Sequence, residues 1–125
     1  MAHILIVEDN PTNLKLASLI LRDGGHETEG AADAEEATLA IARRVPDLIL
    51  MDIGLPGKDG YELTRDLRER PETQDVPILA VTSFAMKGDR AKAMEAGCNG
   101  HLTKPIDRVS LLSEIRRLVP TDGAS

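Results

Sequence analysis

The sequence is nearly devoid of cysteine and of aromatic residues. It has one cysteine, Cys98, no tryptophan, one tyrosine and one phenylalanine among 125 residues. A single thiol cannot form a disulfide within the chain, so a disulfide-stapled fold is excluded and a reducing, cytoplasmic location is expected. With 2% aromatic and 42% hydrophobic residues, the core must consist mainly of aliphatic side chains. This composition argues against disorder, and the length suits one domain.

Positive charge and long apolar runs are also scarce. The formal net charge is −6, so nucleic-acid phosphates would repel the chain and no direct nucleic-acid partner is expected. We interpret the arginine pairs at 43–44 and 116–117 as solvated helix faces. The apolar stretch near the amino terminus is short and ends in acids, which predicts neither a signal peptide nor a membrane segment.

Short apolar runs alternate with helical patterns along the chain. Strands buried on both faces are expected where apolar residues are consecutive, and edge strands where the pattern is weaker. The buried strands are expected at 3–7, 48–51 and 78–81, and the edge strands at 26–30 and 100–103. Apolar spacing and capping residues predict helices at 13–23, 33–45, 59–70, 89–96 and 107–119. Asp33 with Glu36, and Asp59 with Glu62, have the spacing of capping boxes.

This alternation predicts an α/β fold built on one parallel sheet. Strand and helix alternate five times, which favours a five-stranded, doubly wound sheet with right-handed crossovers in the flavodoxin-like order 2-1-3-4-5. Residues 1–119 would form this domain. Residues 120–125 are expected to be a disordered tail or a linker stub.

Four of the expected strands end in groups that bind cations or phosphate. These groups are Glu8 and Asp9, Asp52, Thr82 and Ser83, and Thr103, Lys104 and Pro105. In a doubly wound sheet, ligands bind outside the carboxyl ends of the strands, where the strand order reverses. The sequence therefore predicts a polar site at that edge.

The three acids of this set would repel one another unless a cation lay between them. Magnesium is the cation that suits oxygen ligands, because it binds through one or two carboxylates together with phosphate oxygens. Lys104 would supply a positive charge and Thr82 a hydroxyl for a bound anion. Asp52 ends the central strand, and a carboxylate can act as a nucleophile toward phosphorus. We therefore predict Mg²⁺-dependent phosphoryl transfer to Asp52.

Four stretches contain these strand-end residues: "VEDN", "LILMDIGLPGKDG", "AVTSFAMKGD" and "LTKPI". Through these motifs, residues 2–119 resemble response-regulator receiver domains of the CheY-like superfamily, particularly small single-domain receivers of the DivK type. The resemblance implies that Asp52 takes a phosphoryl group from a histidine kinase or a histidine phosphotransfer protein. It also implies that Glu8, Asp9 and the backbone carbonyl of Gly54 bind Mg²⁺ together with Asp52. Lys104 would contact the phosphate, and its bond to Pro105 is often cis in the family.

Two positions depart from the pattern of the family that the chain resembles. Thr82 matches the switch hydroxyl, but His101 stands where the switch is usually an aromatic residue. The positions that tune water access hold Gly54 and Phe84, and neither side chain can orient an attacking water. We therefore expect self-dephosphorylation to be unremarkable or slow in the absence of a partner. Thr82, Phe84, His101 and Pro105 are the candidate switch and output residues.

Two alternatives remain open on sequence grounds. The chain could be a receiver module of a hybrid histidine kinase or of a longer response regulator. A phosphatase of the haloacid dehalogenase type also uses an aspartate nucleophile, but it needs a second acid two residues later to protonate the leaving group, where this chain has Gly54. We expect a switch and not an enzyme, with self-catalysed phosphoryl uptake and loss only. It would signal to a downstream protein target as a monomer or weak dimer, without contact to a membrane.

Overall fold

The computed structural model of the protein describes residues 2–55, 57–83 and 88–119. The strands in these ranges are β1 (His3–Val7), β2 (Glu27–Ala31), β3 (Leu48–Asp52), β4 (Ile78–Thr82) and β5 (Gly100–Thr103). The helices are α1 (Pro11–Asp23), α2 (Ala34–Arg43), α3 (Gly60–Arg68), α4 (Asp89–Ala96) and α5 (Arg108–Leu118). All strand pairs are parallel and the order is β2-β1-β3-β4-β5. The predicted fold class and strand order are thereby confirmed.

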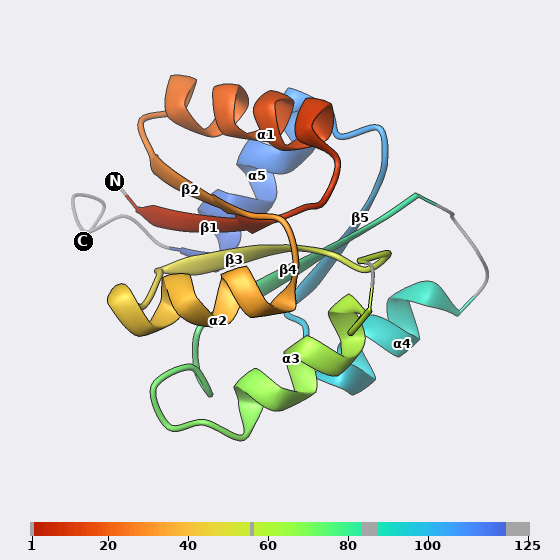
Figure 1. Cartoon of the computed structure of the whole chain (residues 1–125). Coiled ribbons are helices and arrows are strands. Elements are labelled where there is room, and N and C mark those ends of the chain that lie inside the picture. Colours follow the sequence, from red (N-terminus) through yellow and green to blue (C-terminus); the bar gives the residue numbers. More distant parts are fainter. Residues whose placement is uncertain (1, 56, 84–87, 120–125) are drawn as a thin grey trace.

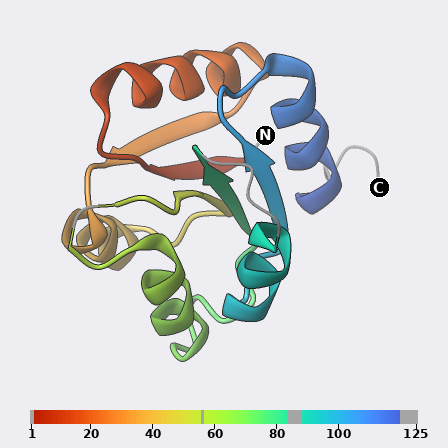
Figure 2. The same ribbon diagram turned by 90° about the vertical axis from the view of Figure 1, so that its right-hand side faces the viewer.

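Helices cover both faces of the sheet. Figure 1 shows α1 and α5 on one face and α2, α3 and α4 on the other, and the turned view of Figure 2 agrees. Alternate residues of a central strand point to opposite faces, so β3 contributes Ile49 to the core under α2, α3 and α4, and Leu50 to the core under α1 and α5. Because both faces are covered, β1, β3 and β4 are buried along their whole length. This explains their consecutive apolar residues.

The first helix begins two residues earlier than the expected start at Asn13. The side chain of Asn10 accepts hydrogen bonds from the backbone N–H groups of Thr12 at 2.9 Å and Asn13 at 3.1 Å, and Pro11 is the first helical residue. Asparagine before proline is a strong start signal, because proline has no N–H to leave unpaired. The helix therefore starts immediately after the acids that follow β1.

The two predicted capping boxes differ in the structure. At α3, the Asp59 carboxylate accepts the Glu62 N–H and the Glu62 carboxylate accepts the Asp59 N–H. At α2, Asp33 caps the Glu36 N–H, but the Glu36 carboxylate accepts the N–H of Ala32 instead of that of Asp33. The capping box predicted for Asp33 and Glu36 was therefore wrong in one of its two hydrogen bonds, the one from the Asp33 N–H to the Glu36 side chain. The helix start that it predicted is correct.

The side chain of Arg68, the last residue of α3, links the loop before β4 to the loop between α4 and β5. Its guanidinium donates to four backbone carbonyls and one side-chain amide, those of Thr73, Gln74, Val76, Gly97 and Asn99. These acceptors lie before β4 and between α4 and β5. Burial lowers the pKa of this guanidinium, while the nearby Cys98 and Asp75 oppose that shift.

No helix among the described residues is both long enough and apolar enough to cross a membrane.

Candidate functional site

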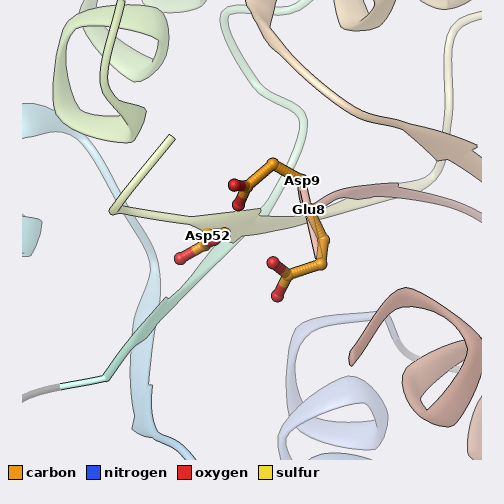
Figure 3. A group of neighbouring side chains, drawn as sticks. All are labelled: Glu8, Asp9 and Asp52. Carbon is orange, nitrogen blue, oxygen red and sulfur yellow. The ribbon is translucent and has the colours of Figure 1, made fainter. Parts of the chain in front are cut away.

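The carboxyl ends of β1 and β3 bring three acids together. Val7 pairs with Met51 in the parallel register, so the residues that follow, Glu8 and Asp52, lie side by side at the edge of the sheet. Glu8 and Asp52 are buried, and Asp9 is exposed. One carboxylate oxygen from each of the three lies within 4.8 Å of the other two. Figure 3 shows these side chains gathered at the strand ends.

Lys104 brings a positive charge to the same acids from the end of β5. Its Nζ lies 2.8 Å from Glu8 Oε1 and 3.5 Å from Asp52 Oδ2. The Lys104 backbone N–H donates to the carbonyl of Thr82 at 2.7 Å, which fixes the start of this loop against β4. The peptide bond to Pro105 is cis, as the resemblance implied.

The acids outnumber the positive charge that faces them. Burial raises the pKa of Glu8, and the neighbouring Asp52 adds to this effect, while the Lys104 ammonium opposes it. For Lys104, burial lowers the pKa, but the hydrogen bond to Glu8 and the charge of Asp52 outweigh burial and raise it. Three oxygen donors with an incompletely neutralised charge fit a hard divalent cation such as Mg²⁺. The donor set contains no nitrogen or sulfur ligand, which softer metals favour.

Thr82 and His101 lie on one face of the sheet. Thr82 is two residues beyond Ala80, and Ala80 pairs with His101 across β4 and β5. Side chains alternate along strands, so both point toward the face covered by α2, α3 and α4, where Ala80 is part of the core. Thr82 is 8% exposed. Nε2 of the half-buried His101 has no hydrogen-bond partner among the described residues.

Gly54 and Pro105 follow the ends of β3 and β5 and lie in two loops beside the acids. The Gly54 N–H donates to Asp52 Oδ1 at 3.1 Å, so this loop folds back onto the Asp52 carboxylate. Pro105 is exposed. The prediction for Phe84 concerns a position outside the described residues.

Sequence reasoning missed Gly60, the first residue of α3. A Cβ built on Gly60 would lie 2.6 Å from the carbonyl oxygen of Asp52 and 2.8 Å from Cα of Ile53. Its N–H donates to the Ile53 carbonyl at 3.1 Å. Glycine therefore lets the helix start approach the backbone that carries Asp52. A glycine immediately after the capping residue Asp59 was the available signal.

Comparison with known proteins matches residues 4–116 to the response regulator receiver domain. This chain belongs to that family. The response regulator DivK of Brucella anthropi, a polar-differentiation regulator, is 39% identical over 113 residues, which cover 90% of this chain and 92% of DivK. The response regulator PleD of Caulobacter vibrioides is 38% identical over 117 residues, which cover 94% of this chain. The match spans only 26% of PleD.

The solved structures include similar receivers that belong to kinases. The receiver domain of the sensor histidine kinase PA1611 of Pseudomonas aeruginosa has a TM-score of 0.87 and is 38% identical, with 96% of this chain and 98% of that one covered. A magnesium ion is coordinated in its active-site cleft. The likeness extends to CheY-type chemotaxis receivers, so the fold is the CheY-like, flavodoxin-like one.

Membership of the family sets the class of function. Receiver domains are phosphorylation-dependent switches that bind Mg²⁺ at an acidic site and interact with histidine kinases and downstream targets. The chain is thus a phosphoacceptor receiver of a two-component system. Neither the hybrid-kinase module nor the phosphatase is favoured over this function.

Proposed function

We propose that Asp52 is the phosphoacceptor and that its neighbours divide the work of transfer. The carboxylates of Glu8, Asp9 and Asp52, with the Gly54 carbonyl, would hold Mg²⁺, which neutralises charge on the phosphoryl oxygens. The observation that carries this proposal is the approach of three carboxylate oxygens within 4.8 Å beside one ammonium. Asp52 is the acid of this set that ends the central strand, β3.

The transfer would move one phosphoryl group and one electron pair. A carboxylate oxygen of Asp52 attacks phosphorus while the bond from phosphorus to the donor histidine nitrogen breaks and its electrons stay with the imidazole. The product is an acyl phosphate on Asp52. Lys104 would stabilise negative charge on the equatorial oxygens. The phosphoryl donor is a histidine kinase or a histidine phosphotransfer protein.

Phosphorylation would alter the structure at the ends of β4 and β5. It replaces one negative charge on Asp52 by about two and adds acceptor oxygens, which attract the Thr82 hydroxyl and the Lys104 ammonium. If this favours one of two arrangements of β4, β5 and α4, the population shifts toward it. His101 occupies the usual place of the switch aromatic. Phe84 and Pro105 are the other proposed output residues.

Output would pass to a downstream protein target by direct contact. We propose a cytoplasmic monomer or weak dimer without a nucleic-acid or membrane ligand, on the basis of the negative net charge and the single thiol. Residues 1–119 would be the receiver, and residues 120–125, which lie outside the described residues, a tail or linker. Catalysis would be limited to the protein's own phosphoryl uptake and loss.

Labelling with a small phosphodonor tests the proposal. The purified chain is incubated with acetyl phosphate and Mg²⁺, and intact mass spectrometry follows the gain of one phosphoryl group. We expect labelling of the wild type and none of Asp52→Asn or of samples with excess EDTA. Beryllofluoride binding offers a cheaper parallel test. A wild type that stays unlabelled, or an Asp52→Asn variant that labels equally, would refute Asp52 as the acceptor.

Loss of the Thr82 hydroxyl tests the switch separately from the chemistry. Thr82→Ala should keep the Mg²⁺-dependent phosphorylation of Asp52. It should lose the NMR chemical-shift changes in β5 that phosphorylation causes in the wild type. Serine at this position should restore them, because it keeps the hydroxyl. Equal spectral changes in the wild type and Thr82→Ala would exclude this hydroxyl from the switch.

A further inference from the structure

The edge strand β2 has one side that is open to a further strand. It pairs with β1, and no other strand lies beside it in the described part of the chain. The Glu27 N–H donates to the Ala2 carbonyl at 2.8 Å and so faces β1. The hydrogen-bonding groups of successive residues alternate between the two sides of a strand. The N–H and C=O groups of Thr28 and Gly30 therefore face away from β1.

A groove of about 360 Å³ lies between this edge and α1. Figure 1 shows α1 lying along β2, and the turned view of Figure 2 agrees. Leu14 and the half-exposed Leu19 line the groove with apolar surface, and the hydroxyls of Ser18 and Thr28 are hydrogen-bonded to each other at 2.8 Å. Clefts of this size with apolar walls and a few polar groups are typical ligand sites. The groove can therefore accept an apolar side chain.

The groove is basic, although the chain as a whole is acidic. The charged residues that line it are Lys15 and Arg22, both exposed, whereas the net charge of the chain is −6. No ion pair between described residues includes either of these two side chains. Charge complementarity therefore favours an acidic ligand.

The charges on the opposite face of β2 are already balanced. Glu29 pairs there with Arg43 at 2.7 Å, and Glu27 pairs with Arg44 at 3.2 Å. Two copies of β2 that paired in antiparallel fashion about Glu29 would set two of these acids opposite each other, which is destabilising. A segment of a different protein therefore suits this edge better than a second copy of the chain does.

We propose that the open edge of β2 binds an extended acidic segment of a partner protein as an added strand. The backbone of the segment would pair with the N–H and C=O groups of Thr28 and Gly30, and its alternate side chains would enter the groove. Lys15 and Arg22 are seven residues apart in α1, about 10.5 Å along the helix axis. Acids four residues apart on a strand are separated by about 13 Å, a difference that long side chains can bridge. The segment would therefore carry two acids four residues apart, with an apolar residue midway between them.

A peptide titration tests this proposal. The probe is the heptapeptide TETLTET, acetylated and amidated, and two-dimensional NMR follows the backbone amides of the ¹⁵N-labelled 125-residue chain. We expect saturable shifts of the Thr28 and Gly30 amides. At a peptide concentration ten times the dissociation constant, hydrogen exchange of both amides should be about ten-fold slower. The peptide TKTLTKT, in which lysine replaces glutamate, should bind at least about ten-fold more weakly.

Two matched double variants distinguish the two faces of this edge. Lys15→Gln/Arg22→Gln removes two exposed positive charges beside the groove, and Arg43→Gln/Arg44→Gln removes two from the opposite face. The first should weaken binding of TETLTET about five-fold or more, and the second by under about two-fold. Circular dichroism checks that each variant keeps the fold.

The outcomes decide between strand addition and its rivals. A saturable, glutamate-dependent shift with slowed exchange of Thr28 and Gly30 would support strand addition at β2. Equal binding of the two peptides, equal losses in the two double variants, or shifts in α1 without slowed exchange in β2 would overturn it. Concentration-dependent shifts of the same amides without peptide would assign the edge to a second copy and overturn the partner segment. Because β1 separates β2 from β3, failure to label Asp52 would refute the proposed function and leave this inference standing.

Discussion

Replacing Gly60 by alanine should displace Asp52, because the added methyl group would clash with the backbone that carries it. A Cβ at this position would meet the Asp52 carbonyl oxygen at 2.6 Å and Ile53 Cα at 2.8 Å. Ordinary carbon contacts need about 3.5 Å, so β3 and the start of α3 must separate by roughly 0.8 Å. Both contacts are with backbone, which cannot rotate away. The strain therefore falls on the loop that carries Asp52 and on the hydrogen bond from the Gly60 N–H to the Ile53 carbonyl.

The cost can be estimated from its parts. Overpacking of a buried site costs about 1–3 kcal/mol, and a weakened hydrogen bond adds about 1 kcal/mol. Alanine recovers up to about 1 kcal/mol of helix propensity, and less than that at the first helical residue. We expect Gly60→Ala to lower the free energy of unfolding by about 2 kcal/mol, which corresponds to a fall in Tm of roughly 6–10 °C. Displacement of Asp52 should also slow acetyl phosphate labelling by about ten- to hundred-fold.

Urea unfolding and labelling with acetyl phosphate measure the two effects. Gly54→Ala is the matched control for stability, because a Cβ there meets only Asp52 Oδ1 at 3.8 Å and the backbone is not left-handed. It should change the free energy of unfolding by under about 0.5 kcal/mol. If Gly60→Ala matched the wild type in both stability and labelling rate, the argument that this close approach positions Asp52 would fail.

Three further perturbations test other parts of the molecule. Arg68→Ala should lower the free energy of unfolding by about 3 kcal/mol, because three part-buried carbonyls each lose a donor worth about 1 kcal/mol. The exposed Arg65 of the same helix, replaced by alanine, should change it by under about 0.5 kcal/mol, and equal losses would contradict this account. Phe84→Glu should speed loss of label from the phosphorylated protein, since a carboxylate can orient water, and an unchanged rate would remove that explanation. The raised folded pKa of Glu8 means that its contribution to stability is present below pH about 4.5 and is lost as pH rises through the folded pKa. Without Mg²⁺, the wild type should therefore lose stability relative to Glu8→Gln as the pH rises, and a constant or opposite difference in urea unfolding would refute the sign.

The positions of the buried strands and most helix starts could be predicted from local chemistry alone. The runs that became β1, β3 and β4 are apolar at every position because helices cover both faces. Asp33, Asp59 and Asp107 each accept a backbone N–H three residues later and begin a helix. The start of α1 was wrong by two residues, because the pattern of apolar residues was given more weight than the Asn10–Pro11 signal.

Side-chain partners across loops were beyond the sequence. The carbonyl acceptors of Arg68 come from loops whose paths depend on packing. No pattern of residue types marks such a bond. The sequence likewise placed Lys104 beside the acids but could not assign it to Glu8, because that preference is a difference of about 0.7 Å between the distance to Glu8, 2.8 Å, and the distance to Asp52, 3.5 Å. The sequence predicts which charged groups lie together at the carboxyl edge of the sheet, whereas the three-dimensional geometry decides which of them form ion pairs.

The charge at this edge dictates an order of events for the proposed reaction. Most buried side chains of the sheet are neutral and apolar, whereas Glu8 and Asp52 are buried acids that share one ammonium. Buried charge with incomplete pairing is costly, and such departures from the rules of the fold concentrate at functional sites. Transfer to Asp52 would add about one more negative charge, which the Lys104 ammonium alone cannot balance. We therefore expect the cation to bind before the phosphoryl group is transferred. Without Mg²⁺, the negative charge of the acids should repel the phosphodonor and Asp52 should not be labelled.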